Sequence, residues 1–179
     1  ATALGLDNSN NVIVTGASIR VGGILEYHTV KYNNSGVQQW ARVFDTAGDV
    51  NGVFGGDIVS FTNKMTIDFT NHIYILGHKF NGNNYDFVIV RSSPLGTEQW
   101  NVTHNSNTGI TDLAVDITVD GLGRLFITGL SFSTPAVNII TIRYDQTPVY
   151  TVPDLQNEVP ASNFHFYENK GQLSDVNGN

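Results

Sequence analysis

Three aspartates carry carboxyl groups that could act in acid–base catalysis: Asp7, Asp68 and Asp120. Each stands four residues ahead of a short apolar run that ends in glycine. A glycosidase needs two such acids about 5–10 Å apart across a cleft. These three recur at equivalent places in a repeated phrase, so the repeat explains them better than catalysis does. We therefore predict no catalytic residue and expect that the chain is not an enzyme.

Metal and thiol chemistry finds little support in the sequence. The five histidines show no HxH or HExxH spacing: His28, His72, His78, His104 and His165. The segment "DNSNN" (7–11) lacks the glycine and closing glutamate of an EF-hand loop, and "DVNGVFGGD" (49–57) offers only scattered oxygens. We expect no metal or other cofactor, with calcium left open as an alternative. No cysteine is present, which excludes disulfides and a cysteine nucleophile.

Composition indicates a β-rich, turn-rich protein. Hydrophobic residues make up 40% of the 179 residues, enough for a buried core, whereas charged residues make up only 14%. Twenty asparagines and 18 glycines suit hairpin ends. A net charge of −7 without a basic cluster excludes nucleic-acid binding and disfavours anionic membranes. No apolar run approaches the roughly 18 residues of a membrane span.

A phrase repeated three times predicts how these residues are positioned. Its copies are "NVIVTGAS" (11–18), "HIYILGHK" (72–79) and "RLFITGLS" (124–131). Each copy closes on a glycine: Gly16, Gly77 and Gly129. Each aspartate opens a short segment that contains Asn or Gly: "DNSNN" (7–11), "DFTNH" (68–72) and "DGLGR" (120–124). Asp, Asn and Gly tolerate the bent backbone of a tight turn. Each unit is therefore expected to open with a β-hairpin.

A second pair of strands is expected in each unit. The third strand carries a basic residue five positions after a polar one, and we expect these cations to pair with Glu26 and Asp86 or to lie at sheet edges: Lys31, Arg91 and Arg143. In the first two units a turn glycine and a tryptophan follow, namely Gly36 with Trp40 and Gly96 with Trp100. We expect both tryptophans to wedge between neighbouring sheets, each burying on the order of 200 Å².

The predicted fold is all-β, a β-propeller-like array of four-stranded antiparallel blades, because several strands are apolar on both faces. Residues 1–147 hold about three repeats, whereas a closed ring needs about four to eight. The chain is therefore expected to be an excised piece of a longer protein whose other blades complete a larger ring, with an open array of stacked units as the alternative. The repeats are expected at about 1–61, 62–113 and 114–147, followed by a proline-containing linker at 148–163 and a following segment or extended tail at 164–179.

The aspartate, the turn, "VIVTG" and then "YHTVKYN" with its glycine and tryptophan resemble the seven-bladed β-propeller repeat family. This family is common in large secreted and cell-surface proteins of Bacteroidota, and the resemblance covers residues 1 to about 147. The tail "FHFYENKGQLSDVNGN" (164–179) is similar to the ENKGQ segment that often opens the mature region of such proteins. The resemblance implies type IX export, an extracellular or cell-surface location, and non-catalytic display or adhesion. "DTA" (45–47) also fits the O-glycosylation pattern of Bacteroidota, which makes Thr46 a candidate acceptor.

We therefore expect a non-catalytic scaffold or binding module of adhesion type, part of a longer exported bacterial protein. Its expected partners are other repeats of the same parent protein or neighbouring subunits, and its Asn- and Thr-rich surface also suits glycans. Two alternatives stay open. One is a polysaccharide-acting enzyme module with acids gathered at a central opening, and the other is a structural subunit of a surface filament or layer.

Overall fold

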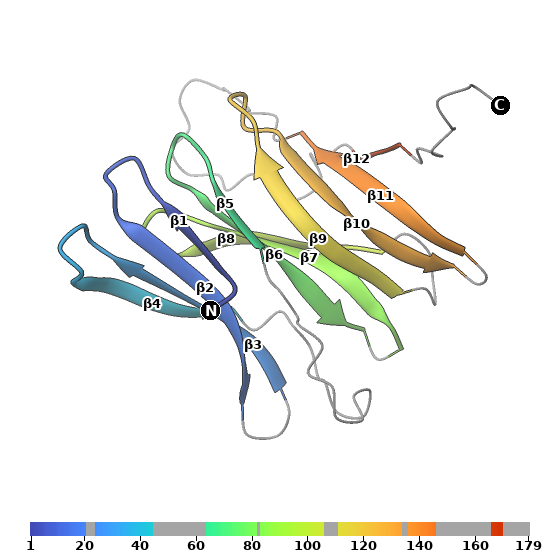
Figure 1. The fold of residues 1–179 in the computed structure, drawn as a ribbon, viewed down its shortest axis with the longest axis horizontal. Helices are drawn as coiled ribbons and strands as arrows, with labels where there is room; N and C mark the ends of the chain where they lie inside the picture. Colours follow the sequence, from blue (N-terminus) through green and yellow to red (C-terminus); the bar gives the residue numbers. More distant parts are fainter. Residues whose placement is uncertain are drawn as a thin grey trace.

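The computed structural model describes residues 1–20, 24–44, 64–81, 83–105, 111–133, 136–145 and 166–169. Regular structure within these ranges is entirely β, which confirms the all-β prediction. The strands form three four-stranded antiparallel sheets that lie one after another along the chain (Figure 1). The prediction of four strands per sheet is confirmed.

The three sheets share one strand order, and we number them I, II and III. Sheet I is formed by β1 (Ala3–Leu6), β2 (Val12–Arg20), β3 (Ile24–Tyr32) and β4 (Gln38–Phe44). Sheet II is formed by β5 (Lys64–Ile67), β6 (Ile73–Phe80), β7 (Tyr85–Ser92) and β8 (Glu98–His104). Sheet III is formed by β9 (Thr111–Val119), β10 (Leu125–Ser133), β11 (Ala136–Tyr144) and β12 (Phe166–Asn169).

The fourth strand of sheet III comes from the tail. The sequence predicts a following segment or extended tail from residue 164, whereas Phe166–Asn169 pairs antiparallel with β11, Thr141 opposite Asn169 and Tyr144 opposite Phe166. This strand takes the place that β4 and β8 take in the other sheets. An unpaired β11 would expose a row of backbone N–H and C=O groups, which gives the added strand a physical reason. The expected linker lies outside the described residues.

The hairpin that opens each unit closes through the same turn, as predicted. The backbone N–H of each aspartate donates to the carbonyl four residues later at 3.0 Å, in the pairs Asp7–Asn11, Asp68–His72 and Asp120–Arg124. The residue three after each aspartate has a positive φ: 58° at Asn10, 66° at Asn71 and 78° at Gly123. Asn and Gly tolerate this left-handed backbone at little cost, so residue type at one position sets the hairpin.

The core lies between the sheets in two layers. Between sheets I and II the buried cluster contains Ile13, Tyr27, Trp40, Phe44, Ile73, Ile75, Val88 and Val90. Between sheets II and III it contains Tyr74, Leu76, Phe87, Ile89, Ala114, Ile117, Leu125, Ile127, Ile140, Ile142 and Tyr144. Sheet II contributes alternate residues to both layers, which is why its strands read as continuous apolar runs.

The first strands of the three sheets lie close to one another. β5 contacts both β1 and β9, and Figure 1 shows these strands side by side near the middle of the molecule. β9 begins at Thr111, just ahead of the repeat boundary expected at residue 114. The repeated hairpins therefore bring equivalent turns and equivalent side chains together where one sheet meets the next.

Candidate functional site

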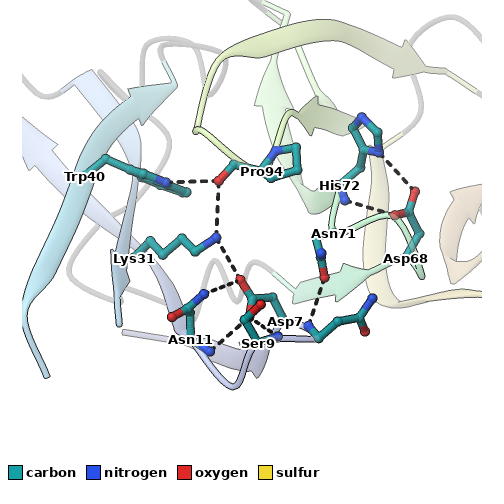
Figure 2. Close-up of polar contacts among 10 residues, drawn as sticks. Asp7, Ser9, Asn11, Lys31, Trp40, Asp68, Asn71, His72 and Pro94 are labelled. Carbon is teal, nitrogen blue, oxygen red and sulfur yellow. Dashed lines mark hydrogen bonds and ion pairs between the residues drawn. The ribbon is translucent and has the colours of Figure 1, made fainter. Parts of the chain in front are cut away.

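The candidate site is the junction between neighbouring sheets, which the repeated residues build. Each aspartate of the repeat uses one carboxylate oxygen to hold its own turn. Oδ1 of Asp7 accepts hydrogen bonds from the backbone N–H groups of Ser9 and Asn11, both at 2.9 Å (Figure 2). The corresponding oxygen of Asp68 accepts from Thr70 at 2.8 Å and His72 at 2.9 Å.

Asp120 repeats this arrangement in sheet III. Its Oδ1 accepts hydrogen bonds from the backbone N–H groups of Leu122 and Arg124, both at 2.9 Å. In all three turns the accepted N–H groups stand two and four residues after the aspartate. This local bonding is the reason that aspartate recurs at the position, since a short carboxylate can reach both N–H groups of its own turn.

The second carboxylate oxygen meets a different partner in each unit. Asp7 Oδ2 lies 2.8 Å from Lys31 Nζ in an ion pair between two buried side chains. Asp68 Oδ2 accepts a 2.8 Å bond from the Tyr74 hydroxyl. In sheet III the partner is Arg124, whose Nε lies 2.6 Å from Asp120 Oδ2 on a more exposed surface. Both oxygens of each carboxylate therefore have at least one hydrogen-bond or ion-pair partner.

These contacts hold the aspartates in their ionised form. Burial alone would raise the pKa of Asp7, but the hydrogen bonds from Lys31, Asn11 and Ser9 lower it to about 2. Burial likewise opposes the shift at Asp68, whose pKa is nevertheless lowered by Thr70, His72 and Tyr74. Burial would raise the pKa of Asp120 too, but the hydrogen bonds from Arg124 and Leu122 together lower it. A carboxyl group with a lowered pKa is a poor general acid at neutral pH.

The predicted pairing of the third-strand cations was wrong. Lys31 pairs with Asp7 rather than Glu26, and Arg91 donates through Nε to the Tyr74 hydroxyl at 3.1 Å rather than to Asp86. Arg143 pairs with Asp145 at 2.8 Å. The reason is the alternation of side chains along a strand, since residues five apart point to opposite faces of the sheet.

Two donors of sheet I converge on one carbonyl of sheet II. The Trp40 indole N–H donates to the Pro94 carbonyl at 3.2 Å, and Lys31 Nζ donates to the same oxygen at 3.3 Å (Figure 2). A Cβ atom at Gly96 would lie 2.9 Å from the Trp40 ring. The indole therefore rests against the β7–β8 turn, in the inter-sheet position expected for it.

Further contacts at the two junctions come from Trp100, between sheets II and III, and from the opening turns of sheets I and II. Trp100 is partly buried against the cluster between sheets II and III, with its ring centroid 6.2 Å from that of Tyr74. At the other junction, Asn8 donates through its backbone N–H to Asn71 Oδ1 at 2.9 Å and through its side-chain amide to the Phe69 carbonyl at 2.7 Å. Turns as well as strands therefore connect successive sheets.

In sheets II and III, the glycine that closes the apolar run packs against an aromatic ring of the preceding sheet. A Cβ atom at Gly77 would lie 2.3 Å from the Tyr27 hydroxyl oxygen, and one at Gly129 would lie 2.1 Å from the Phe87 ring. Both aromatic side chains are fully buried. Only glycine leaves room for a ring this close to the backbone, so the repeated glycine and the aromatic residue of β3 or β7 form one unit.

His78 connects sheet II to both of its neighbours. Its backbone carbonyl accepts a 2.8 Å bond from the Tyr27 hydroxyl, and its backbone N–H donates to the same oxygen at 2.6 Å. Its Nε2 atom accepts a 2.8 Å bond from the backbone N–H of Ala114 in β9. Burial lowers the pKa of His78 to about 4, so the ring is neutral at physiological pH and can accept this bond.

Sequence reasoning identified the glycines, tryptophans and aspartates of the junction but missed Tyr27, Phe87 and His78. A signal for the first two was present, because each follows the leading acid of a third strand at the same place in its unit. His78 follows the repeated glycine, but its burial depends on sheet III and left no mark in the repeat. Thr46 and the segment at 49–57 lie outside the described residues.

The described residues show neither a metal site nor a membrane-spanning helix, and the chain has no recognised relative among the family models and curated proteins. Within the described ranges, no group of three or more His, Asp or Glu side chains could hold a metal ion. The same residues include no helix long and apolar enough to cross a membrane. No family model matches the chain, and no curated protein matches it significantly.

Replacing Gly77 by alanine should destabilise the fold, because its Cβ atom would overlap the Tyr27 ring and hydroxyl. We expect the free energy of unfolding in urea to fall by about 1–3 kcal/mol, as for other overpacked cores. Gly121→Ala is the matched control, because a Cβ atom there meets open space and should change stability by about 0.5 kcal/mol or less. Equal effects of the two substitutions would contradict the assignment.

Lys31→Met should cost about 1–3 kcal/mol, because it leaves the Asp7 carboxylate buried without its ion-pair partner. The double variant Asp7→Asn with Lys31→Met should recover part of this loss, since no unpaired charge remains. Arg124→Met, which breaks the more exposed pair with Asp120, should cost clearly less than Lys31→Met, because water screens that pair. Strictly additive urea-unfolding energies for Asp7 and Lys31 would show that the pair is not coupled.

Acid should weaken the fold through His78. In the unfolded chain its imidazole takes up a proton near its ordinary pKa of 6.5, whereas the folded state resists until about pH 4. Stability is therefore full above pH 6.5 and falls as the pH drops toward 4, by up to about 3 kcal/mol. His78→Gln keeps an acceptor for Ala114 but does not titrate, so urea unfolding across this window should be flatter in the variant. Parallel curves would rule out this role.

Proposed function

We propose that the chain is a run of three consecutive β-propeller blades that serves as a non-catalytic scaffold or binding module. Its three sheets share strand order and opening-turn geometry, and sheets I and II also share the β-bulge between the third and fourth strands, at Lys31/Tyr32 and Arg91/Ser92. First strands that lie close together are what blades arranged around an axis require. The array is accordingly part of a larger ring of the same repeats.

One observation carries the non-catalytic part of the proposal: the polar residues of the repeat are used in holding turns and joining sheets. The carboxylates of Asp7, Asp68 and Asp120 accept from turn N–H groups and from a further donor each, and none has a raised pKa. Lys31 and Trp40 are bonded across a junction. Such residues give rigidity to a surface that other parts of the molecule present to a ligand.

We propose that the chain is a portion of a longer exported protein and lies at the surface of a bacterium. The support is the resemblance of its repeat to one that is common in such proteins. The turns at the ends of the blades expose polar side chains such as Asn8, Asn34 and Thr70. Amide and hydroxyl groups of this kind match the hydroxyl groups of sugars as hydrogen-bond donors and acceptors. Glycans are therefore the ligand class that we propose for the module.

A polysaccharide-acting enzyme is the second candidate, and one residue favours it. Asp86 differs from the three turn aspartates because burial raises its pKa, with the Asp112 charge acting in the same direction and Asn81 opposing it. Its Oδ1 atom is buried and has no hydrogen-bond partner among the residues that the structure describes. A carboxyl group in this state is the type that serves as a general acid, so it is the residue to remove when catalysis is tested.

A glycan array run beside a turnover assay separates the two candidates. Fluorescently labelled chain should bind a subset of glycans, and release of reducing ends from those same glycans should stay at the level of a protein-free control. Asp86→Asn should bind the same glycans unchanged. Glycan turnover by the unmodified chain that disappears in Asp86→Asn would replace the scaffold proposal with the enzyme. If the unmodified chain binds no glycan on the array, glycans are not its ligand class.

A further inference from the structure

The outer face of sheet I exposes side chains that are covered at the same repeat positions elsewhere. Leu4 and Leu6 of β1 are 73% and 56% exposed. Aligning the turn aspartates places these positions level with Met65 and Ile67 in β5, which pack against the cluster between sheets I and II. The same alignment leads to Ile117 and Val119 in β9, which belong to or pack against the cluster between sheets II and III.

The outer face of sheet III shows the complementary pattern. Tyr27 in β3 and Phe87 in β7 occupy one repeat position, and both are fully buried against the glycine of the following sheet. Ile139 occupies that position in β11 and is 53% exposed. Val137, two residues before it on the same face, is 56% exposed. Among the described residues, sheet III therefore presents the projecting half of a junction that no following sheet covers.

Sheet I presents the receiving half of the same junction. Gly16 stands at the repeat position of Gly77 and Gly129, and its backbone faces the outer side of the stack. The backbone of Ala1 lies beside Gly16, where a Cβ atom would approach it to 2.8 Å. This resembles Gly129, where the carbonyl of Leu113 lies beside the glycine in addition to the Phe87 ring. A neighbouring strand at this glycine is therefore compatible with an inserted side chain.

Polar positions continue the match between the two faces. Lys31 donates from sheet I to the Pro94 carbonyl in the turn of sheet II. Arg143 stands at the repeat position of Lys31 on the outer face of sheet III, and Asn34 stands at the position of Pro94 in sheet I. Asn34 and the next two residues of that turn, Ser35 and Gly36, are exposed. If sheet III packs on sheet I of another copy as sheet I packs on sheet II, the Arg143 guanidinium group lies near the Asn34 carbonyl.

We infer that the outer face of sheet III binds the outer face of sheet I of a second copy of this chain, head to tail. A second copy is the occupant that we propose, because it carries both halves of a junction that the chain already forms twice. This inference rests on the blade architecture of the proposed function. The contact uses two different surfaces, so association continues until a ring closes or a filament grows.

The test uses one charge on each face. Light scattering over a concentration series should give the unmodified chain at least twice the monomer mass at high concentration. Leu4→Asp removes the receiving face and Ile139→Asp removes the projecting face, so each variant alone should stay monomeric. An equimolar mixture of the two should form a dimer, because intact sheet III of the first variant meets intact sheet I of the second.

Controls separate failure of association from failure of folding. Both substituted residues are more than half exposed, so thermal unfolding should shift little, and Leu95→Asp in an exposed turn should associate like the unmodified chain. A monomeric unmodified chain at every concentration overturns the inference while leaving glycan binding and the scaffold proposal intact. Self-association of either single variant overturns it as well, because that result requires a contact between identical faces.

Discussion

The close approach of an aromatic ring to a glycine backbone sets the distance between successive sheets. Tyr27 against Gly77 and Phe87 against Gly129 occupy the same place in the repeat, and neither contact tolerates a Cβ atom. A ring buried in this way supplies a large apolar area and fixes the register of one sheet on the next. The apolar residues on either side then fill the remaining space in rows that repeat from junction to junction.

Each junction also has a buried polar connection through His78, and the two connections use different chemistry. Between sheets I and II the Tyr27 hydroxyl bonds both backbone groups of His78. Phe87 has no hydroxyl, and between sheets II and III the imidazole of His78 accepts from Ala114 instead. A buried polar group without a partner is costly, so each connection favours one alignment of the sheets over a slipped one. Repeated geometry is therefore maintained although the repeated side chains differ.

The parts of this arrangement that were predictable from sequence are local. The opening turn of sheet I depends on Asp7 and on Asn10 three residues later. The sequence repeats this spacing of aspartate and Asn or Gly in every unit. Pairing of Lys31 with Asp7 was not predicted, because it depends on which face of β3 each side chain takes. The strand at Phe166–Asn169 was not predicted either, since its pairing with β11 consists of backbone bonds between distant segments that leave no side-chain pattern.

Stability in a stacked array is close to a sum over sheets and the junctions between neighbours, and terminal sheets normally carry a polar outer face. The outer faces of sheets I and III are not polar in this way, because Leu4 on one and Ile139 on the other are the apolar side chains of interior positions. Sheet II shows what such positions look like when covered on both sides, with Ile75 and Leu76 fully buried on opposite faces. By their side chains the outer sheets resemble interior sheets, so the physical unit that this sequence encodes is the junction rather than the single sheet.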